Sequence, residues 1–237
     1  MNPSDLSTSS SGSSVGESSR ESLTSQSHNA AVELTKGISS GQFRPGEKLN
    51  EVDIAAQLGV SRNTLREGFA TLAAQGLVER IPHRGVFITQ PTLTQMLDLY
   101  TARIILEPGS LLWGSRVGLD GLDGIVRQAE AARDEQGGNS SEVDIQLISD
   151  ANHDFHRTIV ASACSQHLET AMSRILAQMR LAFMHATEID PAFHVHFITE
   201  NRIVADLVAE EKYEEAAQKL SESLSRTRDY LPQFFTG

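Results

Sequence analysis

The chain has 237 residues, of which 39% are hydrophobic, and its formal net charge is -11. This length and composition allow a substantial core and two domains. No stretch approaches the roughly 20 apolar residues of a membrane span, and the N-terminus lacks the basic and apolar regions of a secretory signal. The single cysteine, Cys164, excludes an internal disulfide. We therefore expect a cytoplasmic protein without a membrane partner.

The first 27 residues, 12 of them serine, lack apolar periodicity. Such a segment cannot bury enough apolar surface to offset the entropy of ordering, so we expect residues 1–27 to form a disordered tail. Beyond it the charge is uneven: residues 28–90 carry seven Lys or Arg against six acidic residues, and residues 91–237 carry 12 against 22. Contact with a nucleic acid would therefore be confined to residues 28–90.

Residues 51–67 have the pattern of a helix, a tight turn and the start of a second helix. Apolar side chains recur at helical spacing before Gly59, which suits a left-handed turn, and Ser61 is a good N-cap for the following helix. In a helix-turn-helix, the first residues of the second helix face base edges in the major groove. Here those residues are Arg62, Asn63, Thr64 and Arg66. The segment therefore predicts DNA binding.

The rest of this N-terminal segment adds one helix before the motif and a hairpin after it. We predict a first helix over residues 29–40 and a recognition helix over residues 62–75. Two β-prone runs, 77–81 and 86–89, are joined by the basic turn Pro82-His83-Arg84-Gly85. This pattern predicts a wing, which can approach the DNA backbone or enter the minor groove beside the recognition helix.

A resemblance to the winged helix-turn-helix of GntR-type bacterial transcription regulators covers roughly residues 29–90 and rests on the run GQFRPGEKLNEVDIAAQLGVSRNTLREGFATLAAQGLVERIPHRGVFIT. The run combines a PG..L.E..IA..LGVSR opening, an RE pair, an L...GLV ending and an RG wing. Where the family commonly has Thr-Pro, this chain has Asn63-Thr64, and Gly68 replaces a frequent alanine. The resemblance implies that the matching residues contact an operator: Arg62, Asn63, Thr64, Arg66, His83, Arg84 and Gly85. We add the N-cap Ser61 to this DNA-binding set, together with Arg44, which we expect to attract phosphates without reading sequence.

From Thr92 onward the apolar period is helical almost everywhere. We predict six helices over residues 92–118, 121–136, 142–164, 167–188, 193–210 and 212–231. Short connections between them indicate an antiparallel bundle of six or seven helices, and Pro108 should loosen or kink the first helix. The expected fold is therefore mainly α, with a winged helix-turn-helix over residues 28–90 and an effector-binding and dimerisation domain over residues 91–237.

The run Arg103-Ile104-Ile105-Leu106-Glu107 and the later run DFHRTIV resemble the all-helical effector domain of the FadR subgroup, often called FCD. Many such domains hold a divalent metal through an Asp or Asn and three His. The matching positions here are Asn152, His156, Asn201 and Ser223. Because only one imidazole remains, and amides and hydroxyls are weak ligands for zinc or nickel, we expect no cofactor and no tightly bound transition metal. If a metal binds, Asn152 and His156 are the candidate ligands.

Polar side chains inside an apolar bundle are costly unless they are paired. They either satisfy one another or surround a polar ligand. We expect a ligand such as a carboxylate, which Arg103 could grip with two parallel hydrogen bonds. The alternative is that Arg103 pairs with Glu107 one turn along the same helix. The expected effector-binding residues are Arg103, Asn152, His156, Arg180, Asn201 and Ser223.

These observations predict a ligand-responsive transcription regulator that binds a palindromic, double-stranded operator as a homodimer. Repression released by a small organic acid is the expected response. Two other functions remain open at this point. One is a metal-dependent sensor that uses His156 and neighbouring polar residues. The other is an enzyme with His156 as general base, which we do not expect because no nucleophile or acid partner lies at a diagnostic spacing.

Overall fold

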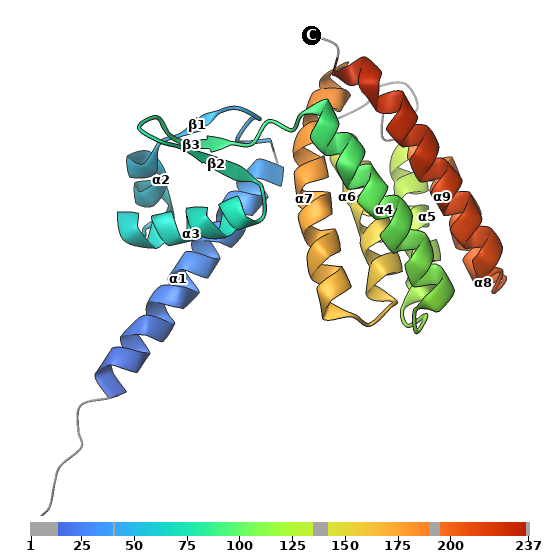
Figure 1. Cartoon of the computed structure of the whole chain (residues 1–237), viewed down its shortest axis with the longest axis horizontal. Coiled ribbons are helices and arrows are strands. Elements are labelled where there is room, and N and C mark those ends of the chain that lie inside the picture. The colour runs from blue at the N-terminus through green and yellow to red at the C-terminus, as the bar shows by residue number, and fades with distance from the viewer. Residues whose placement is uncertain (1–13, 40, 135–141, 190–194, 236–237) are drawn as a thin grey trace, which may run out of the picture.

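The computed structural model of the chain describes residues 14–39, 41–134, 142–189 and 195–235. A small head of helices and strands is followed by a bundle of long helices (Figure 1). Among the described residues, no helix is long and apolar enough to cross a membrane. The expected mainly helical architecture, with a small winged head, is confirmed.

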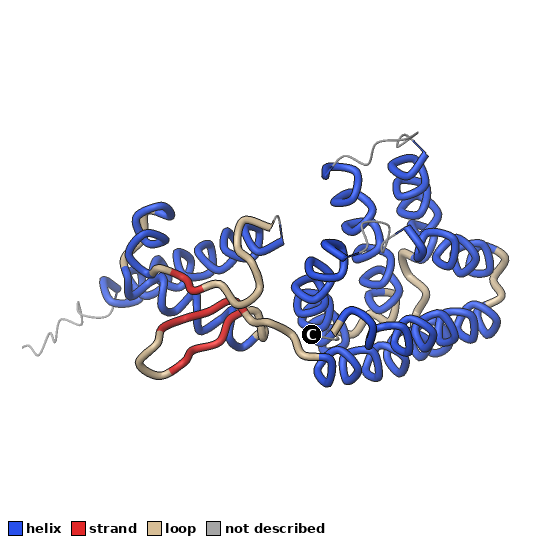
Figure 2. The backbone as a smooth tube through the Cα atoms, turned by 90° about the horizontal axis from the view of Figure 1, so that it is seen from above, coloured by secondary structure: helices blue, strands red, loops and turns tan. Residues whose placement is uncertain are grey.

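The elements of the head are α1 (Ser14–Ser39), β1 (Lys48–Leu49), α2 (Glu51–Leu58), α3 (Arg62–Ala74), β2 (Val78–Ile81) and β3 (Gly85–Ile88). Helices α2 and α3 form the helix-turn-helix, and α3 is its recognition helix. Figure 2 shows the strands along one side of the helices.

Helix α1 is longer than the sequence predicts. It begins at Ser14, so residues 14–27 are helical where we expect a disordered tail. Its C-terminal half packs on the rest of the head through Ala31, Leu34 and Ile38, which are buried. Because this packing holds the helix, each further residue toward the N-terminus adds a hydrogen bond without a new nucleation cost. Residues 1–13 of the predicted tail lie outside the described part of the chain.

The turn between α2 and α3 forms as its residues predict. Gly59 adopts the left-handed conformation, with φ of 64°, and Ser61 caps α3 by accepting a hydrogen bond of 3.1 Å from the backbone N of Thr64. Gly68 allows α1 to approach α3 closely, because a Cβ atom there would lie 3.2 Å from the backbone oxygen of Ser27. The recognition helix is therefore fixed between α2 and α1.

The wing is a three-stranded antiparallel sheet in the order β1-β3-β2. The predicted hairpin of β2 and β3 is confirmed, with Glu79 opposite Phe87. Strand β1 was not predicted, because two residues are too short to show a period of two. It pairs Lys48 with Phe87 and Leu49 with Val86, and it ties the loop before the helix-turn-helix to the wing.

The helices of the bundle are α4 (Leu93–Trp113), α5 (Leu122–Asp134), α6 (Glu142–Ala161), α7 (Gln166–Ile189), α8 (Val195–Ala209) and α9 (Tyr213–Tyr230), with short 3-10 turns at Leu119–Gly121 and Leu231–Phe234. They match the six predicted helices, with the largest difference at the end of α4. That helix continues through Pro108 without a break.

The bundle helices pack with α4 against α9 and with α5 against α6 and α8. Their shared core includes Tyr100, Phe155 and Met179, which are completely or almost completely buried. Helix α7 stands on the side of the bundle that faces the head (Figure 1). This arrangement places one bundle helix between the bundle core and the recognition helix.

Candidate DNA-binding surface and buried polar cluster

The first turn of α3 presents its basic side chains to solvent. Arg62, Asn63 and Arg66 are exposed, as expected for residues that reach base edges. Glu51, in the first turn of α2, faces both arginines: its Oε2 lies 2.9 Å from Arg66 Nε and 3.5 Å from Arg62 Nη2. One carboxylate therefore holds two candidate DNA-contacting side chains in place.

Thr64 does not belong to this exposed surface. It is only 2% exposed, and its hydroxyl lies 2.7 Å from the hydroxyl of Ser61. As the third residue of the helix, it turns back toward the N-cap and is occupied in holding the start of α3 together. The structure therefore assigns Thr64 a supporting position, which corrects our expectation that its side chain faces the bases. Ser61 remains exposed beside it.

The tip of the wing is also exposed and basic. His83 and Gly85 have positive φ values, 62° and 115°, and Arg84 lies between them with its guanidinium 5.5 Å from the centre of the Phe87 ring. Arg80 Nη2 donates a hydrogen bond of 3.2 Å to the backbone oxygen of Arg66, so the wing is tied to the recognition helix. This contact was not predicted. A pairing between residues 14 apart has no local signature in the sequence.

Arg44 is exposed in the loop before β1. Its backbone N donates a hydrogen bond of 2.8 Å to Glu47 Oε2. The Arg44 guanidinium takes no part in this hydrogen bond. The position is compatible with attraction to phosphate.

The centre of the bundle contains a buried charged cluster formed by α4 and α6. Arg103, Glu107 and His156 are between 0% and 5% exposed. Arg103 Nε donates a hydrogen bond of 2.6 Å to Glu107 Oε1, and His156 Nδ1 lies 2.6 Å from Glu107 Oε2. The Arg103–Glu107 pair, which the sequence offered as an alternative to ligand binding, is present. The contact with His156 extends it into a cluster of three.

The protonation states of this cluster follow from its contacts. Burial by itself raises the pKa of Glu107, but the charge of Arg103 and the hydrogen bonds from Arg103 and His156 outweigh it, so the net pKa is lowered and the carboxyl stays ionised. Burial, followed by the charge of Arg103, lowers the pKa of His156. Because an ionised carboxylate only accepts hydrogen bonds, neutral His156 carries its proton on Nδ1. The cluster then has one cation and one anion.

Arg103 has further neighbours in the core. Its Nη1 lies 3.5 Å from Met179 Sδ, and its guanidinium lies 5.1 Å from the centre of the Tyr100 ring. Burial raises the pKa of Tyr100 to about 12, so its hydroxyl stays protonated. Arg103 Nη2 is buried and has no hydrogen-bond partner among the described residues. An unsatisfied guanidinium nitrogen is costly, and an anion could satisfy it.

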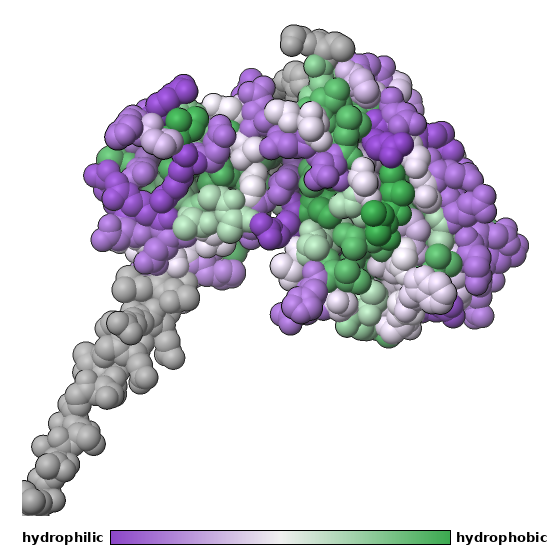
Figure 3. Space-filling model, viewed as in Figure 1, coloured by the Kyte–Doolittle hydropathy of each residue, from purple (hydrophilic) through white to green (hydrophobic). Residues whose placement is uncertain are grey.

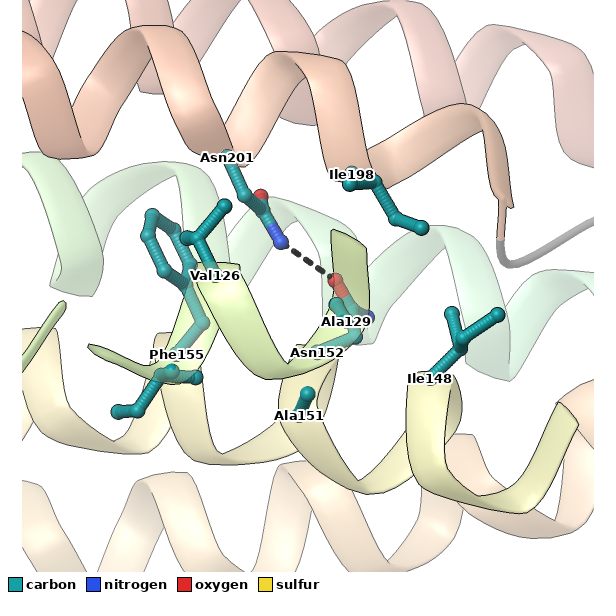
Figure 4. A pocket seen from close by; sticks show the side chains of 9 residues that line it. Val126, Ala129, Ile148, Ala151, Asn152, Phe155, Ile198 and Asn201 are labelled. Carbon is teal, nitrogen blue, oxygen red and sulfur yellow. Dashed lines mark hydrogen bonds between the residues drawn. The ribbon is translucent and has the colours of Figure 1, made fainter. Parts of the chain in front are cut away.

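Asn152 and Asn201 form a separate buried pair between α6 and α8. Asn201 Nδ2 donates a hydrogen bond of 2.9 Å to Asn152 Oδ1 (Figure 4). The pair lines a cavity of about 10 Å³ whose other walls are mainly apolar. That volume suffices for about one water molecule. In this conformation the cavity is too small for an organic ligand.

The remaining two expected effector residues lie elsewhere. Arg180 forms an ion pair with Asp150 between α7 and α6. Ser223 lines an open surface cleft of about 390 Å³ between α8 and α9, together with Phe197 and Arg226. The six residues expected to form one pocket are therefore divided among a charged cluster, an amide pair, an ion pair and a surface cleft.

The described residues contain no group of three or more His, Cys, Asp or Glu side chains that could hold a metal ion. Of the two candidate ligands, His156 uses Nδ1 in its contact with Glu107, and Asn152 uses its oxygen in its contact with Asn201. A metal would bind His156 through Nε2, which the contact with Glu107 leaves available, but it would have to share the Asn152 oxygen with Asn201.

The comparisons with known proteins agree with this two-part architecture. The model of the gntR family of bacterial regulatory proteins matches residues 26–88, and the model of the FCD domain matches residues 98–226. A regulator of the Nta operon from Aminobacter aminovorans is 26% identical over 201 residues, which cover 84% of this chain and 90% of the relative. The galactonate operon repressor of Escherichia coli K12 is 23% identical over 207 residues, 79% of this chain and 88% of the relative.

Solved structures show the same fold. A GntR transcriptional regulator from Rhodococcus sp. RHA1 is similar with a TM-score of 0.79 and 28% identity, covering 88% of this chain and 98% of that one. McbR/YncC of Escherichia coli has the same fold with a TM-score of 0.71 at 17% identity. The chain is a member of the GntR family of bacterial regulatory proteins, a DNA-binding transcription regulator with a C-terminal FCD effector domain and not an enzyme.

Proposed function

We propose that this regulator is a cytoplasmic repressor that binds a palindromic operator as a homodimer and releases it when a small organic acid binds its bundle. The observation that carries the DNA-binding part is the exposed first turn of α3, where Arg62, Asn63 and Arg66 extend into solvent. The wing residues His83, Arg84 and Gly85 extend the same basic surface, and Arg44 adds a charge for phosphate contact. A repressor named among the relatives supports repression as the direction of control.

The exposed face of α4 supports homodimerisation. Ile105 is 68% exposed and Trp113 is 87% exposed, and Val117, just beyond the helix, is also exposed. Hydrophobic side chains gather on this face of the bundle (Figure 3). Large exposed apolar groups at helical spacing are typical of interfaces between protein chains. A second copy packed against α4 would relate the two recognition helices by a twofold axis.

The buried cluster supports an anionic effector. Glu107 accepts a hydrogen bond from Arg103 Nε, whereas Arg103 Nη2 has no hydrogen-bond partner among the described residues. A carboxylate could accept from Arg103 Nη2, provided that the surrounding side chains make room for it.

Effector binding at this place requires a change of conformation, because Arg103, Glu107 and His156 are almost completely buried. The cavity beside Asn152 and Asn201 holds only about one water molecule. An acid that binds only an opened form of the bundle would shift the population toward that form. The head is attached to the bundle, so the opened form can differ in its affinity for the operator. This differential binding is the proposed basis of release.

The DNA-binding surface is tested with the Arg62→Ala and Arg66→Ala variants. Each should weaken binding to the chain's own promoter region by roughly tenfold or more, because a bidentate base contact contributes about 1–3 kcal/mol. Arg157→Ala is the matched control, since Arg157 is exposed on α6 and pairs with the exposed Asp154. Fluorescence anisotropy with a labelled promoter duplex measures all three. If Arg62→Ala and Arg66→Ala both bind the duplex as tightly as the control does, the assignment of α3 as the recognition helix is wrong.

A further inference from the structure

The bundle holds the end of the recognition helix through side chains of α7. Arg174 Nη2 donates a hydrogen bond to the backbone oxygen of Ala74, and Gln178 Nε2 donates one of 3.0 Å to the backbone oxygen of Gln75. Ala74 is the last residue of α3 and Gln75 is its C-cap. Carbonyl groups at a helix C-terminus lack partners within their own helix. Here two of them are satisfied by another domain.

A third residue of α7 enters the head itself. Leu181 is completely buried and belongs to the hydrophobic core of the head, with Leu77 and Val78. Arg174, Gln178 and Leu181 are spaced four and three residues apart, so they share one face of α7. We call these three residues the α7 clasp. It fixes the recognition helix to the bundle by two hydrogen bonds and one apolar contact.

The residue after α3 leaves room for this contact. Gly76 has a φ of 74°, and a Cβ atom at this position would lie 2.6 Å from Gln178 Nε2. Any side chain here would collide with the clasp, in addition to the strain of a positive φ.

Other residues in the same turns of α7 contact the bundle interior. Met179 is completely buried, and its Sδ lies 3.5 Å from Arg103 Nη1. Arg180 forms an ion pair with Asp150 of α6. Residues 178–181 therefore contact both domains: Gln178 and Leu181 contact the head, whereas Met179 and Arg180 contact the bundle.

We infer that α7 couples the buried Arg103–Glu107–His156 cluster to the recognition helix, and that Arg174, Gln178 and Leu181 are positioning residues for α3. The clasp and Met179 lie within about two turns of one helix, so a displacement of Met179 when Arg103 changes its contacts moves the clasp as well. The inference rests on the proposed function, because it names the route by which occupancy of the bundle reaches the DNA-binding surface. In a dimer, the orientation of α3 sets the distance between the two recognition helices and hence the accepted half-site spacing.

The first test uses the whole chain and DNA selected by it from a random duplex pool. Duplexes with two half-sites are then remade with the spacer lengthened or shortened by one base pair. The wild-type chain should lose affinity about tenfold for each altered spacer. The Arg174→Ala/Gln178→Ala variant should lose only about twofold, because its heads are free to reorient.

The control is Arg157→Ala/Gln218→Ala, which removes an exposed arginine and an exposed glutamine whose hydrogen bonds are to Asp154 and Glu222. A clasp variant with the full spacer penalty of the wild type overturns the positioning role. If the wild-type chain enriches no sequence from the pool, the proposed function fails instead.

The second test needs no DNA. Hydrogen exchange should be faster at the amides of residues 74–78 in the clasp variant than in the wild-type chain. Glu107→Gln, which alters the cluster without touching the clasp, should also change exchange at these amides if α7 transmits the disturbance. If Glu107→Gln changes hydrogen exchange only at amides of the bundle, and not at residues 74–78, the coupling is overturned. Unchanged exchange in the clasp variant overturns the contact itself.

Discussion

Glu51 Oε2 at the start of α2 lies 2.9 Å from Arg66 Nε in the recognition helix. The same oxygen faces Arg62, so the free protein keeps two candidate DNA-contacting arginines beside a carboxylate. The arrangement has two opposite effects on DNA binding. It orders the guanidinium groups before they meet the bases, and it offsets part of the positive charge that attracts any phosphate backbone. Glu51 should therefore favour specific sites over random DNA.

Replacing Glu51 with Gln should raise affinity for random duplex DNA by about two- to fivefold, because exposed ion pairs of this kind contribute about 1 kcal/mol or less. Affinity for the selected operator should rise less or fall, so the ratio of specific to nonspecific affinity decreases. Fluorescence anisotropy with both duplexes over a range of salt concentrations measures the ratio.

Glu33→Gln is the matched control for this change. Glu33 is exposed on α1 and pairs with Lys36, so its replacement alters the net charge equally without touching the recognition helix. Equal ratios in the two variants would show that Glu51 acts only through net charge.

The main features of the head could be predicted because they depend on local chemistry. Gly59 and Ser61 specify a turn and a cap through their own backbone and side chain, and the hairpin follows from two β-prone runs around a glycine turn. The inward position of Thr64 could also have been predicted, since a polar side chain at the third helical position can return to the N-cap. The length of α1 could not be predicted from the sequence, because it depends on packing against α3.

Ile105→Glu should convert the proposed homodimer to a monomer. The substitution places a charge in the middle of the exposed apolar face of α4, where it would be buried without a partner in a dimer. The dimer dissociation constant should rise by about tenfold or more. Light scattering after size-exclusion chromatography measures the change.

Val52→Glu is the control, since Val52 is an exposed apolar residue of α2 in the head. It should leave the molecular mass of the assembly unchanged. A dimer that tolerates Ile105→Glu as well as it tolerates Val52→Glu would exclude α4 as the interface.

The free energy of unfolding should fall as the pH decreases below about 6.5, and His156 should be one cause. Burial lowers the pKa of His156, so in this range the unfolded chain binds a proton that the folded protein does not. Stability therefore rises with pH through the window, by at most about 1.4 kcal/mol per pH unit. Glu107, whose pKa is lowered, adds a second loss only below about pH 4.3, the ordinary value for Glu.

His156→Gln should flatten the stability profile below about pH 6.5, because glutamine can still donate to Glu107 but does not titrate. Urea unfolding at several pH values measures the slope. His167→Gln, at an exposed position of α7, is the matched control. An unchanged slope in His156→Gln would mean that other groups cause the acid sensitivity.

The bundle could be predicted helix by helix but not contact by contact. Spacing along one helix is enough to pair Arg103 with Glu107. It does not reveal that His156, 49 residues beyond Glu107, completes the cluster, or that Ser223 lies in a different cleft from Asn201. Such relationships depend on which helices are neighbours and how each is rotated about its axis. Helical periodicity shows that one face is apolar, but it does not say which neighbouring helix that face meets.

The Asn152–Asn201 pair should be strongly coupled. Asn201→Leu leaves the buried oxygen of Asn152 without its donor, which should cost about 1–3 kcal/mol of unfolding free energy. Asn152→Leu should cost a similar amount by leaving the Asn201 amide unpaired. The double variant Asn152→Leu/Asn201→Leu removes both polar groups from a mainly apolar cavity, so it should be more stable than the sum of the single changes predicts. Urea unfolding of the four proteins gives the coupling energy. Additive losses would mean that water, rather than the partner amide, satisfies each asparagine when its partner is replaced.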